Sequence, residues 1–525
     1  MLDGSAPASR DRRWTIAAVA FALLAAVGLM YMGRGIGFWY DEWSFLLTRR
    51  GWTADAFLQP HNEHIVVLPV LVYKLLFETV GLSSHWPYRM LPVILHAAIG
   101  VTVFLLARSR VGGPAALVAA GLVLVMGRTA QNLLWAFQIG FLGSVLGGLL
   151  AMLAIDRGRQ VAACIALVAA MLCSGLGIPF ALGITAEQLA GRRYRSLWVP
   201  AVPLGIYAVW WLGYGRGTSH ITADSASQAA EWATNTAAAA AGSLVGLTID
   251  WGRVLLVLLV AALIIHVVRQ QRGTPRLAGL IVAAVSFWGL SGVLRSLTVD
   301  PSTSRYLTLG SIVILLVVVE LLRGVPLTAR ALVAGGLLVV FAGLCSLPAL
   351  RGYAKEQRVW SGLVEAELGA VQLRGPGGPR TFPVDQTYAP QLQAGPFLDA
   401  IRDEGSSPAD TPSELAHAFN AERRQADRVL QSIALITAPA TGTAPGNCVR
   451  LTASPVERTV PAGGLVLDGR GHAAVQMRRF ADDIVNPVTR VTVAGPTVLR
   501  FAPDRSPVPY RVRVSAGDGV VRLCG

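Results

Sequence analysis

The segment FWYDEWSF (38–45) places two adjacent carboxylates, Asp41 and Glu42, among aromatic residues directly after the apolar run 14–33. A carboxylate held near a hydroxyl group can take its proton, which is general-base chemistry. The same residues have a structural alternative, in which Asp41 caps a short helix and Glu42 favours the positive end of its dipole. Both roles stay open, because a capping carboxylate can also face a cavity.

Two histidines follow in the motif QPHNEH (59–64), with Glu63 between them. On a helix, His61 and His64 would share one face, because residues three apart are neighbours. The spacing is not HExxH, which excludes a zinc-protease site. Together with Asp41, the two histidines could hold a divalent cation, or they could contact a phosphate. The alternative is a solvated loop whose histidines bind the backbone.

Two arginines lie at the ends of later apolar runs. Arg295 closes one run, and Arg305, followed by Tyr306, opens the next in SRYLTLG (304–310). Positive charge is disfavoured on the translocated side of a membrane, so we expect both arginines to have a partner there. A guanidinium group binds phosphate oxygens in a bidentate manner. Snorkelling towards lipid headgroups is the alternative.

A fourth polar group lies in RTAQNLLWAFQIGF (128–141). The spacing of Arg128, Gln131, Trp135 and Gln138 predicts one shared helical face. Polar side chains that enter a membrane on one face line a cavity or a helix contact. We therefore expect Arg128 and Gln138 to contribute to a polar cavity, with helix packing as the alternative.

The composition indicates that these residues belong to a membrane protein. Of 525 residues, 53% are hydrophobic and 14% are charged, and the mean hydropathy is +0.52. Soluble proteins carry about a quarter charged residues. The net charge of +14 comes mainly from arginines in short turns between apolar runs, where they set membrane orientation. This distribution argues against nucleic-acid binding, which needs a clustered basic face.

Membrane-crossing helices need about 20 apolar residues each. The arginine pattern predicts eleven spans, a cytoplasmic N-terminus and a hairpin through Ser174-Gly175. It places 34–87, 214–252, 295–305 and everything after about 348 on the outer side of the plasma membrane. Within the first outer loop, the run Ile65 to Phe77 predicts a helix along the interface. The predicted spans are 14–33, 88–107, 114–127, 138–155, 160–174, 176–190, 196–213, 253–268, 277–294, 306–322 and 329–347.

The C-terminal third has a different character. Residues 1–349 form the predicted transmembrane domain, 350–446 a helical extracytoplasmic segment, and 447–525 a small domain of short Val/Thr/Arg alternations typical of antiparallel strands. Outside the cytoplasm, Cys448 and Cys524 could join the first and last strands in a disulfide. No CxxC or zinc-ligand spacing occurs in the sequence, so structural zinc is not expected.

The predicted topology puts all four polar groups on the outer side. A carboxylate base, basic phosphate ligands and an aromatic-lined cavity at a lipid surface suit transfer of a sugar from a lipid phosphate. A lipid-anchored donor needs no nucleotide-binding domain, and the sequence contains neither a Rossmann fingerprint nor a P-loop.

This arrangement resembles the GT-C superfamily of integral-membrane glycosyltransferases, particularly bacterial, actinobacterial members of unassigned substrate. The resemblance covers the architecture of 14–347 and the acidic pair in the first external loop. It implies that Asp41 is the base or an acceptor ligand, with Glu42 beside it and Glu63 as an assisting acid. The implied donor is a polyprenyl-phosphate sugar (hexosyl or pentosyl), and the implied acceptor is an envelope glycan, lipid or protein. No cofactor is certain, and the assignment of Arg305 to the donor phosphate comes from the predicted topology.

Two other functions remain. A transporter would place ionisable residues near the membrane midplane, whereas here the acids cluster at one face and the spans are nearly free of charge. A non-catalytic membrane scaffold with a glycan-binding external domain is the second alternative. The expected fold class is an α-helical polytopic membrane protein with a C-terminal extracytoplasmic α+β domain.

Overall fold

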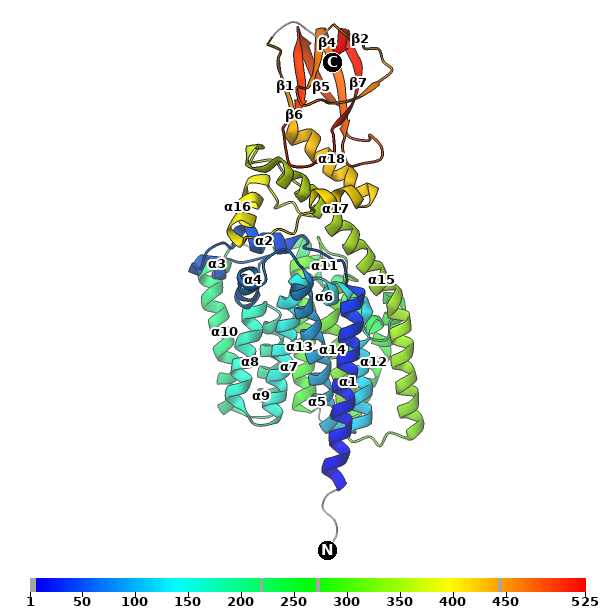
Figure 1. Cartoon of the computed structure of the whole chain (residues 1–525). Helices are drawn as coiled ribbons and strands as arrows, with labels where there is room; N and C mark the ends of the chain where they lie inside the picture. Colours follow the sequence, from blue (N-terminus) through cyan, green and yellow to red (C-terminus); the bar gives the residue numbers. More distant parts are fainter. Residues whose placement is uncertain (1–5, 218–220, 271–273, 442–445) are drawn as a thin grey trace. The chain divides into compact units, whose positions relative to one another are not determined.

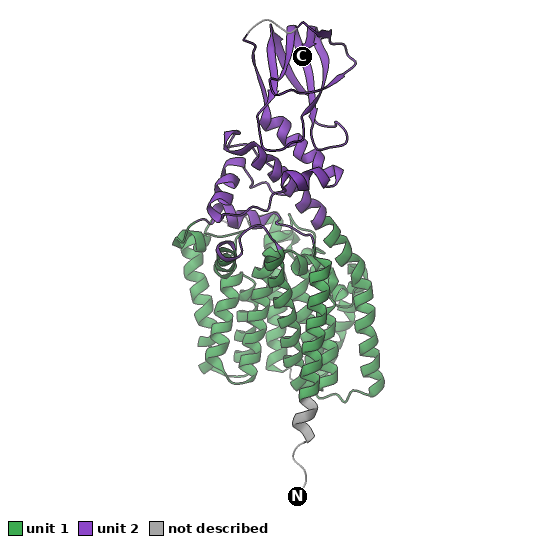
Figure 2. Cartoon of the chain, viewed as in Figure 1, with its two compact units in different colours: residues 1–34, 51–76, 86–356 green, residues 35–50, 77–85, 357–525 purple. Residues whose placement is uncertain are grey.

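The chain forms two compact units, coloured separately in Figure 2. The computed structural model describes residues 6–217, 221–270, 274–441 and 446–525. Unit 1 comprises Met1–Arg34, Gly51–Leu76 and Trp86–Glu356, and unit 2 comprises Gly35–Arg50, Phe77–His85 and Gln357–Gly525. The predicted division at 349/350 therefore lies close to the structural one, but two parts of the loop 34–87 group with the C-terminal region.

Unit 1 is a bundle of helices (Figure 1). Each of the eleven predicted apolar runs is helical, and within the described residues eight helices are long and apolar enough to cross a membrane. The helices are α1 (Ala6–Met32), α5 (Trp86–Leu124), α7 (Ile139–Asp156), α8 (Gln160–Cys173), α9 (Gly177–Ala190), α10 (Trp198–Trp210), α11 (Ala223–Leu244), α12 (Ile249–Gln270), α13 (Pro275–Arg295), α14 (Ser304–Leu321) and α15 (Ala329–Arg374), which continues into unit 2.

Two hairpins account for the difference between the eleven predicted runs and the eight long helices. The single element α5 reverses at Gly112, whose φ of 80° is readily adopted only by glycine. Beyond this turn the chain folds back, and His96 Nε2 lies 3.5 Å from the Leu124 carbonyl oxygen. The helices α8 and α9, with 14 residues each, form the second hairpin through Ser174-Gly175.

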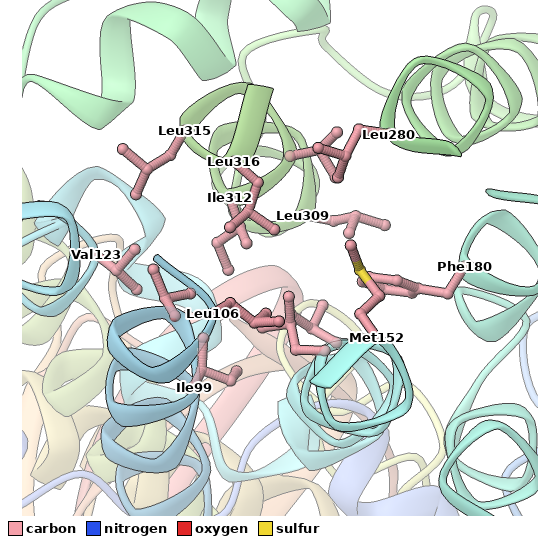
Figure 3. Packing of buried hydrophobic residues seen from close by; sticks show 14 of the residues in the cluster. Ile99, Leu106, Val123, Met152, Phe180, Leu280, Leu309, Ile312, Leu315 and Leu316 are labelled. Atoms are coloured by element: carbon pink, nitrogen blue, oxygen red, sulfur yellow. The ribbon is translucent and has the colours of Figure 1, made fainter. Parts of the chain in front are cut away.

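Buried hydrophobic side chains form a continuous core in the bundle. Figure 3 shows Ile99 and Leu106 of α5, Met152 of α7, Phe180 of α9 and Ile312 of α14 packed against one another, all at most 6% exposed. Burying each such side chain contributes about 1.5–3 kcal/mol in an aqueous reference state. In a bilayer, close packing rather than water exclusion is the main gain.

A network of charged residues joins the helix ends at one end of the bundle. Arg276 binds Asp156 (2.6 Å) and Glu187 (3.0 Å), and Arg110 binds Asp156 (3.0 Å) and also Glu320. These residues come from α5, α7, α9, α13 and α14. Because most of the side chains are buried, loss of one partner would leave an uncompensated charge at a cost of about 3–5 kcal/mol.

Helix α11 lies in the stretch 214–252, which was predicted only as an outer loop. Near its middle, the Trp232 indole donates to the Val299 carbonyl oxygen (2.7 Å), and just beyond its end the Gly246 carbonyl oxygen accepts from Arg128 (2.8 Å). Its alanine run, Ala237–Ala241, is at most 4% exposed. Small side chains let α11 approach α14 closely enough for Ser311 Oγ to donate to the Ala240 carbonyl (2.8 Å).

The predicted interfacial helix corresponds to α4 (Val67–Thr79), which is too short to be among the candidate spans. Figure 1 shows it nearly end-on, while the bundle helices beside it run along the plane of the picture. Its Lys74 is 7% exposed, donates to the Gly51 carbonyl oxygen, and lies 5.4 Å from the Trp52 ring centroid. These contacts explain how a lysine fits within an apolar run.

Unit 2 begins with aromatic packing around the second part of α15. Trp39 stacks on Trp360 with ring centroids 5.6 Å apart, and Trp43 packs edge-on against Phe397. The Gly37 amide donates to Ser361 Oγ (2.9 Å). These long-range contacts group the segment 35–50 with the C-terminal region rather than with the bundle. The remaining helices of unit 2 are α2 (Asp41–Thr48), α16 (Ala394–Glu404), α17 (Pro412–His417) and α18 (Asn420–Ala434).

The C-terminal strands form one antiparallel sheet of seven strands with a central order β1-β6-β4-β7-β2. The sheet begins at residue 435, before the predicted boundary at 447, because α18 runs directly into β1. The long strands β4 and β7 pair along their lengths, with a bulge between His472 and Ala473. The strands are β1 (Leu435–Pro439), β2 (Cys448–Arg450), β3 (Val456–Thr459), β4 (Leu465–Arg478), β5 (Thr489–Ala494), β6 (Thr497–Phe501) and β7 (Arg511–Cys524).

The two cysteines paired by the sequence analysis lie directly opposite each other in β2 and β7, and a disulfide joins them. Because the bond closes a loop with a sequence separation of 76, chain entropy predicts that reduction costs the sheet about 4 kcal/mol.

We expect reducing agent to lower the thermal midpoint of the sheet in the purified protein, and the Cys448→Ala/Cys524→Ala variant to show the same lower midpoint without reductant. Mass spectrometry of the non-reduced wild type should show both thiols blocked. Free thiols at both positions would contradict the expectation. The Cys345→Ala variant, which removes a free thiol, is the control.

Candidate functional site

The HNEH motif is a tight hairpin turn in unit 1. The backbone groups of His61 and His64 exchange two hydrogen bonds of 2.9 Å each, and the turn residues Asn62 and Glu63 have φ values of 46° and 71°. Positive φ at both central positions is typical of the primed hairpin turns. The two histidines therefore face each other across a turn, and the expectation that they share a helical face is wrong.

Glu63 is an unusual residue for this conformation, because side chains other than Gly, Asn and Asp rarely adopt positive φ. Such a backbone costs about 1–3 kcal/mol and persists where surrounding contacts hold it. Arg295 at the end of α13 provides these contacts. Its Nη2 lies 3.1 Å from Glu63 Oε2 and donates to the Asn62 carbonyl oxygen (3.3 Å), while its Nε donates to the Tyr306 hydroxyl (3.2 Å).

The ion pair between Arg295 and Glu63 is only 18% and 16% exposed at the two side chains. Water screens it less than it screens a surface pair. The charge of Arg295 is therefore neutralised inside the protein, and its contacts hold the turn and the Tyr306 ring. We expected Arg295 to have a partner, and the structure provides two, the Glu63 carboxylate and the Asn62 carbonyl oxygen.

Arg305, in the first turn of α14, is in a different situation. Within the described residues its guanidinium group forms no ion pair, and its buried Nε has no hydrogen-bond partner. The group lies 5.4 Å from the Tyr306 ring centroid. A buried donor without a partner is costly. Arg305 therefore keeps its charge and its donors available for an anion.

Arg305 also lines a narrow slot between helices of the bundle, whose side chains pack so closely that no water molecule fits between them. The polar residues of the slot are at one side, where Asn132 Nδ2 donates to the Arg305 carbonyl (2.9 Å) and to Thr308 Oγ1 (2.7 Å). The Oδ1 atom of Asn132 is buried and has no partner among the described residues. The rest of the lining is apolar and comprises Phe141, Leu142, Val145, Leu176, Phe287, Tyr306 and Leu309.

His64 lies beside this cluster as a neutral imidazole. Burial is the largest of the causes that lower the pKa of His64 to about 3, and the charge of Arg295 is the next. A neutral imidazole donates one hydrogen bond and accepts another. Gly175 makes room for it, since a Cβ at that position would lie 3.0 Å from His64 Nδ1 and 3.3 Å from the Tyr207 hydroxyl. His64 is therefore a polar, uncharged group at neutral pH.

The predicted polar face of residues 128–138 does not form. The chain passes through a short 3-10 turn, the helix α6 (Ala130–Leu134), an extended Trp135 and a second 3-10 turn. Arg128 is tied to the backbone of Gly246, as described above. Gln138 is 2% exposed, and its Oε1 has no partner within the described chain. The residue of this segment that lines the slot is Asn132, and the predicted spacing did not single it out.

His61 packs its ring against Phe137 with centroids 5.0 Å apart. In the part of the chain that the structure describes, no group of three or more His, Cys, Asp and Glu side chains is placed to hold a metal ion. The cation site suggested for Asp41, His61 and His64 remains a prediction from the sequence.

The acidic pair belongs to unit 2. Helix α2 begins at Asp41 itself, and its N-cap residue is Tyr40, with φ 48° and no side-chain cap hydrogen bond. The alternative in which Asp41 is the N-cap residue is therefore wrong, and Asp41 is 6% exposed. Glu42 has two structural partners, since one oxygen accepts from the Trp39 amide (3.1 Å) and the other binds His85 Nε2 (2.9 Å).

No protein family, curated protein or solved structure matches the chain. The resemblance to GT-C enzymes therefore stays a hypothesis from the sequence. The arrangement of Arg305, Asn132, His64 and the Arg295–Glu63 pair is a separate observation from the structure.

The pKa of His64 predicts a pH dependence of stability. The unfolded chain binds a proton at this histidine near pH 6.5, and the folded chain binds it only near pH 3. The stability due to neutral His64 is thus complete above about pH 6.5 and is lost as the pH falls towards 3. Between pH 7.5 and 4.5, we expect the thermal midpoint of the wild type to fall further than that of His64→Asn.

The matched control is His417→Asn, which changes an exposed histidine of unit 2. That variant should keep the pH dependence of the wild type. Identical pH profiles for the wild type and His64→Asn would contradict the expectation.

Proposed function

We propose that this protein is an integral-membrane glycosyltransferase, which moves a sugar from a polyprenyl-phosphate donor to a glycan or glycolipid acceptor on the outer face of the plasma membrane. The observation that carries the proposal is Arg305, a cation whose charge and donors are available at the polar side of an apolar slot. A lipid phosphate has the matching chemistry, because it joins an anion to a hydrocarbon chain.

In this proposal, Arg305 binds the donor phosphate and Arg295 does not. Arg295 keeps Glu63 and the turn in place, and Tyr306 is oriented by both arginines. The neutral imidazole of His64 and the free Oδ1 of Asn132 are suited to hydroxyl groups rather than to anions. Arg305 would then stabilise the negative charge that develops on the phosphate as the sugar leaves.

The proposed base is Asp41, the assignment that the sequence favours. Glu42 and Glu63 are both engaged with a cation or a histidine, so their first role is structural. The base takes the proton of the acceptor hydroxyl while that oxygen attacks the anomeric carbon. The bond from this carbon to the phosphate oxygen breaks, and its electron pair leaves with the phosphate.

The proposed topology has eleven crossings, a cytoplasmic N-terminus and an extracytoplasmic C-terminal region. All eleven runs are helical, and the two short helices α8 and α9 form one of the hairpins that this count requires. The turn 61–64, Arg295 and Arg305 would then meet the outer leaflet, where a lipid-linked sugar is available.

We expect Asp41→Asn to lower sugar transfer by roughly 10²- to 10⁴-fold, the usual contribution of a general base. Transfer is measured with purified protein in bilayers, using a radiolabelled polyprenyl-phosphate sugar, and lipid extracts of cells with this variant should accumulate the donor. Asp55→Asn, which changes an exposed carboxylate of the same loop, is the control. Normal turnover in Asp41→Asn would remove Asp41 as the base, and absence of transfer by the wild type would favour a scaffold.

Arg305→Gln should weaken binding of the lipid-phosphate donor by roughly 10- to 100-fold, since hydrogen bonds to a charged group contribute about 1.5–3 kcal/mol. Binding of the acceptor should change little. The exposed Arg323, just after α14, provides the matched control Arg323→Gln. A variant that loses the acceptor and keeps the donor would assign Arg305 to the other substrate.

A further inference from the structure

The outer face of the C-terminal sheet carries a compact group of charges, which we call the arginine patch and define as Arg478 of β4, Arg511 and Arg513 of β7, and Glu457 of β3. Arg478 lies directly opposite Arg511, and Arg513 lies directly opposite Glu457. Opposite residues in an antiparallel pair point to the same side of the sheet, with Cβ atoms about 4.5–5.5 Å apart. The patch thus gathers three guanidinium groups around one carboxylate.

The single carboxylate is shared by two of the arginines. Glu457 Oε1 accepts from Arg478 Nη2 (2.8 Å), and Oε2 lies 4.0 Å from Arg513 Nη2. Arg511 is exposed and forms no ion pair with any described residue. Its nearest cross-strand neighbour on β4 is another arginine, an arrangement that destabilises a sheet.

We propose that the arginine patch binds an anionic glycan polymer, such as one whose sugar or polyol units are linked by phosphodiesters. The Arg478 guanidinium already donates to Glu457 and to the Asp482 carbonyl oxygen. An anion beside Arg511 would offset its repulsion with Arg478 and receive the guanidinium fork of Arg511. The neighbours on the same face are Thr459, opposite Arg511, and Ser515, two residues beyond Arg513. Their hydroxyl groups suit the hydroxyls of a glycan.

The same neighbours argue against a membrane surface as the occupant. A surface that inserts into the headgroup layer needs apolar side chains beside its basic residues, whereas Thr459 and Ser515, which neighbour these arginines on the same face, are polar. The inference concerns retention of a polymer by the sheet and is independent of the proposed sugar transfer.

The test uses the full-length protein in bilayers of neutral lipid and a fluorescent poly(glycerol phosphate) as the probe. We expect binding that weakens with salt and falls roughly fivefold in Arg511→Gln, in the range of one exposed charge contact. Because the substitution removes a like-charge pair, the thermal midpoint of Arg511→Gln should equal or exceed that of the wild type. A purely structural role for Arg511 would lower it.

The matched control is Arg500→Gln, which changes an exposed arginine of β6 and leaves the arginine patch intact. Wild-type binding by this control and no binding of neutral dextran would support the proposal. Equal losses in Arg500→Gln and Arg511→Gln would overturn it, since net charge alone would then explain binding. Undiminished polymer binding by Arg511→Gln would also overturn it.

Discussion

The ion pair between Arg295 and Glu63 is the contact on which the arrangement of the bundle's polar residues depends. It stabilises a backbone turn that would otherwise be unfavourable. It also neutralises Arg295, so that Arg295 is not available as an anion ligand. Tyr306 receives a hydrogen bond from the same arginine. With this pair in place, the polar groups that remain around it are the neutral imidazole of His64 and the guanidinium group of Arg305. This balance of charge suits the proposed binding of a singly charged phosphate group.

Much of the helical framework could be predicted from the sequence. Hydropathy located all eleven apolar runs, and the arginine register selected the hairpin at Ser174-Gly175. Helix α11 escaped prediction because polar residues are scattered among the alanines of its first half, although its small side chains allow closer packing than leucine would. The first outer loop was divided between the two units by aromatic contacts with residues more than 300 positions away. No local pattern in the sequence encodes such contacts.

Several residues were selected from the sequence for a chemical role, but the structure shows contacts for them that the sequence patterns did not indicate. Glu63 and Arg295 were selected separately, yet their importance is that they bind each other. Glu42 was selected as an acid of the catalytic pair and is engaged with His85, a residue that carries no motif. Arg128 and Gln138 were grouped by helical periodicity in a segment whose helix is interrupted twice. Backbone conformation, rather than residue type, decided these outcomes.

The order of strands along the chain has a consequence for biosynthesis. Strand β7 follows all of its partners in sequence, yet it pairs with β2, β3 and β4. Before β7 emerges, β1, β4, β5 and β6 can pair among themselves, but β2 and β3 have no partner among the described strands. The sheet therefore stays incomplete until β7 has emerged, and a chain cut short before β7 leaves unpaired strand edges that can pair with other chains.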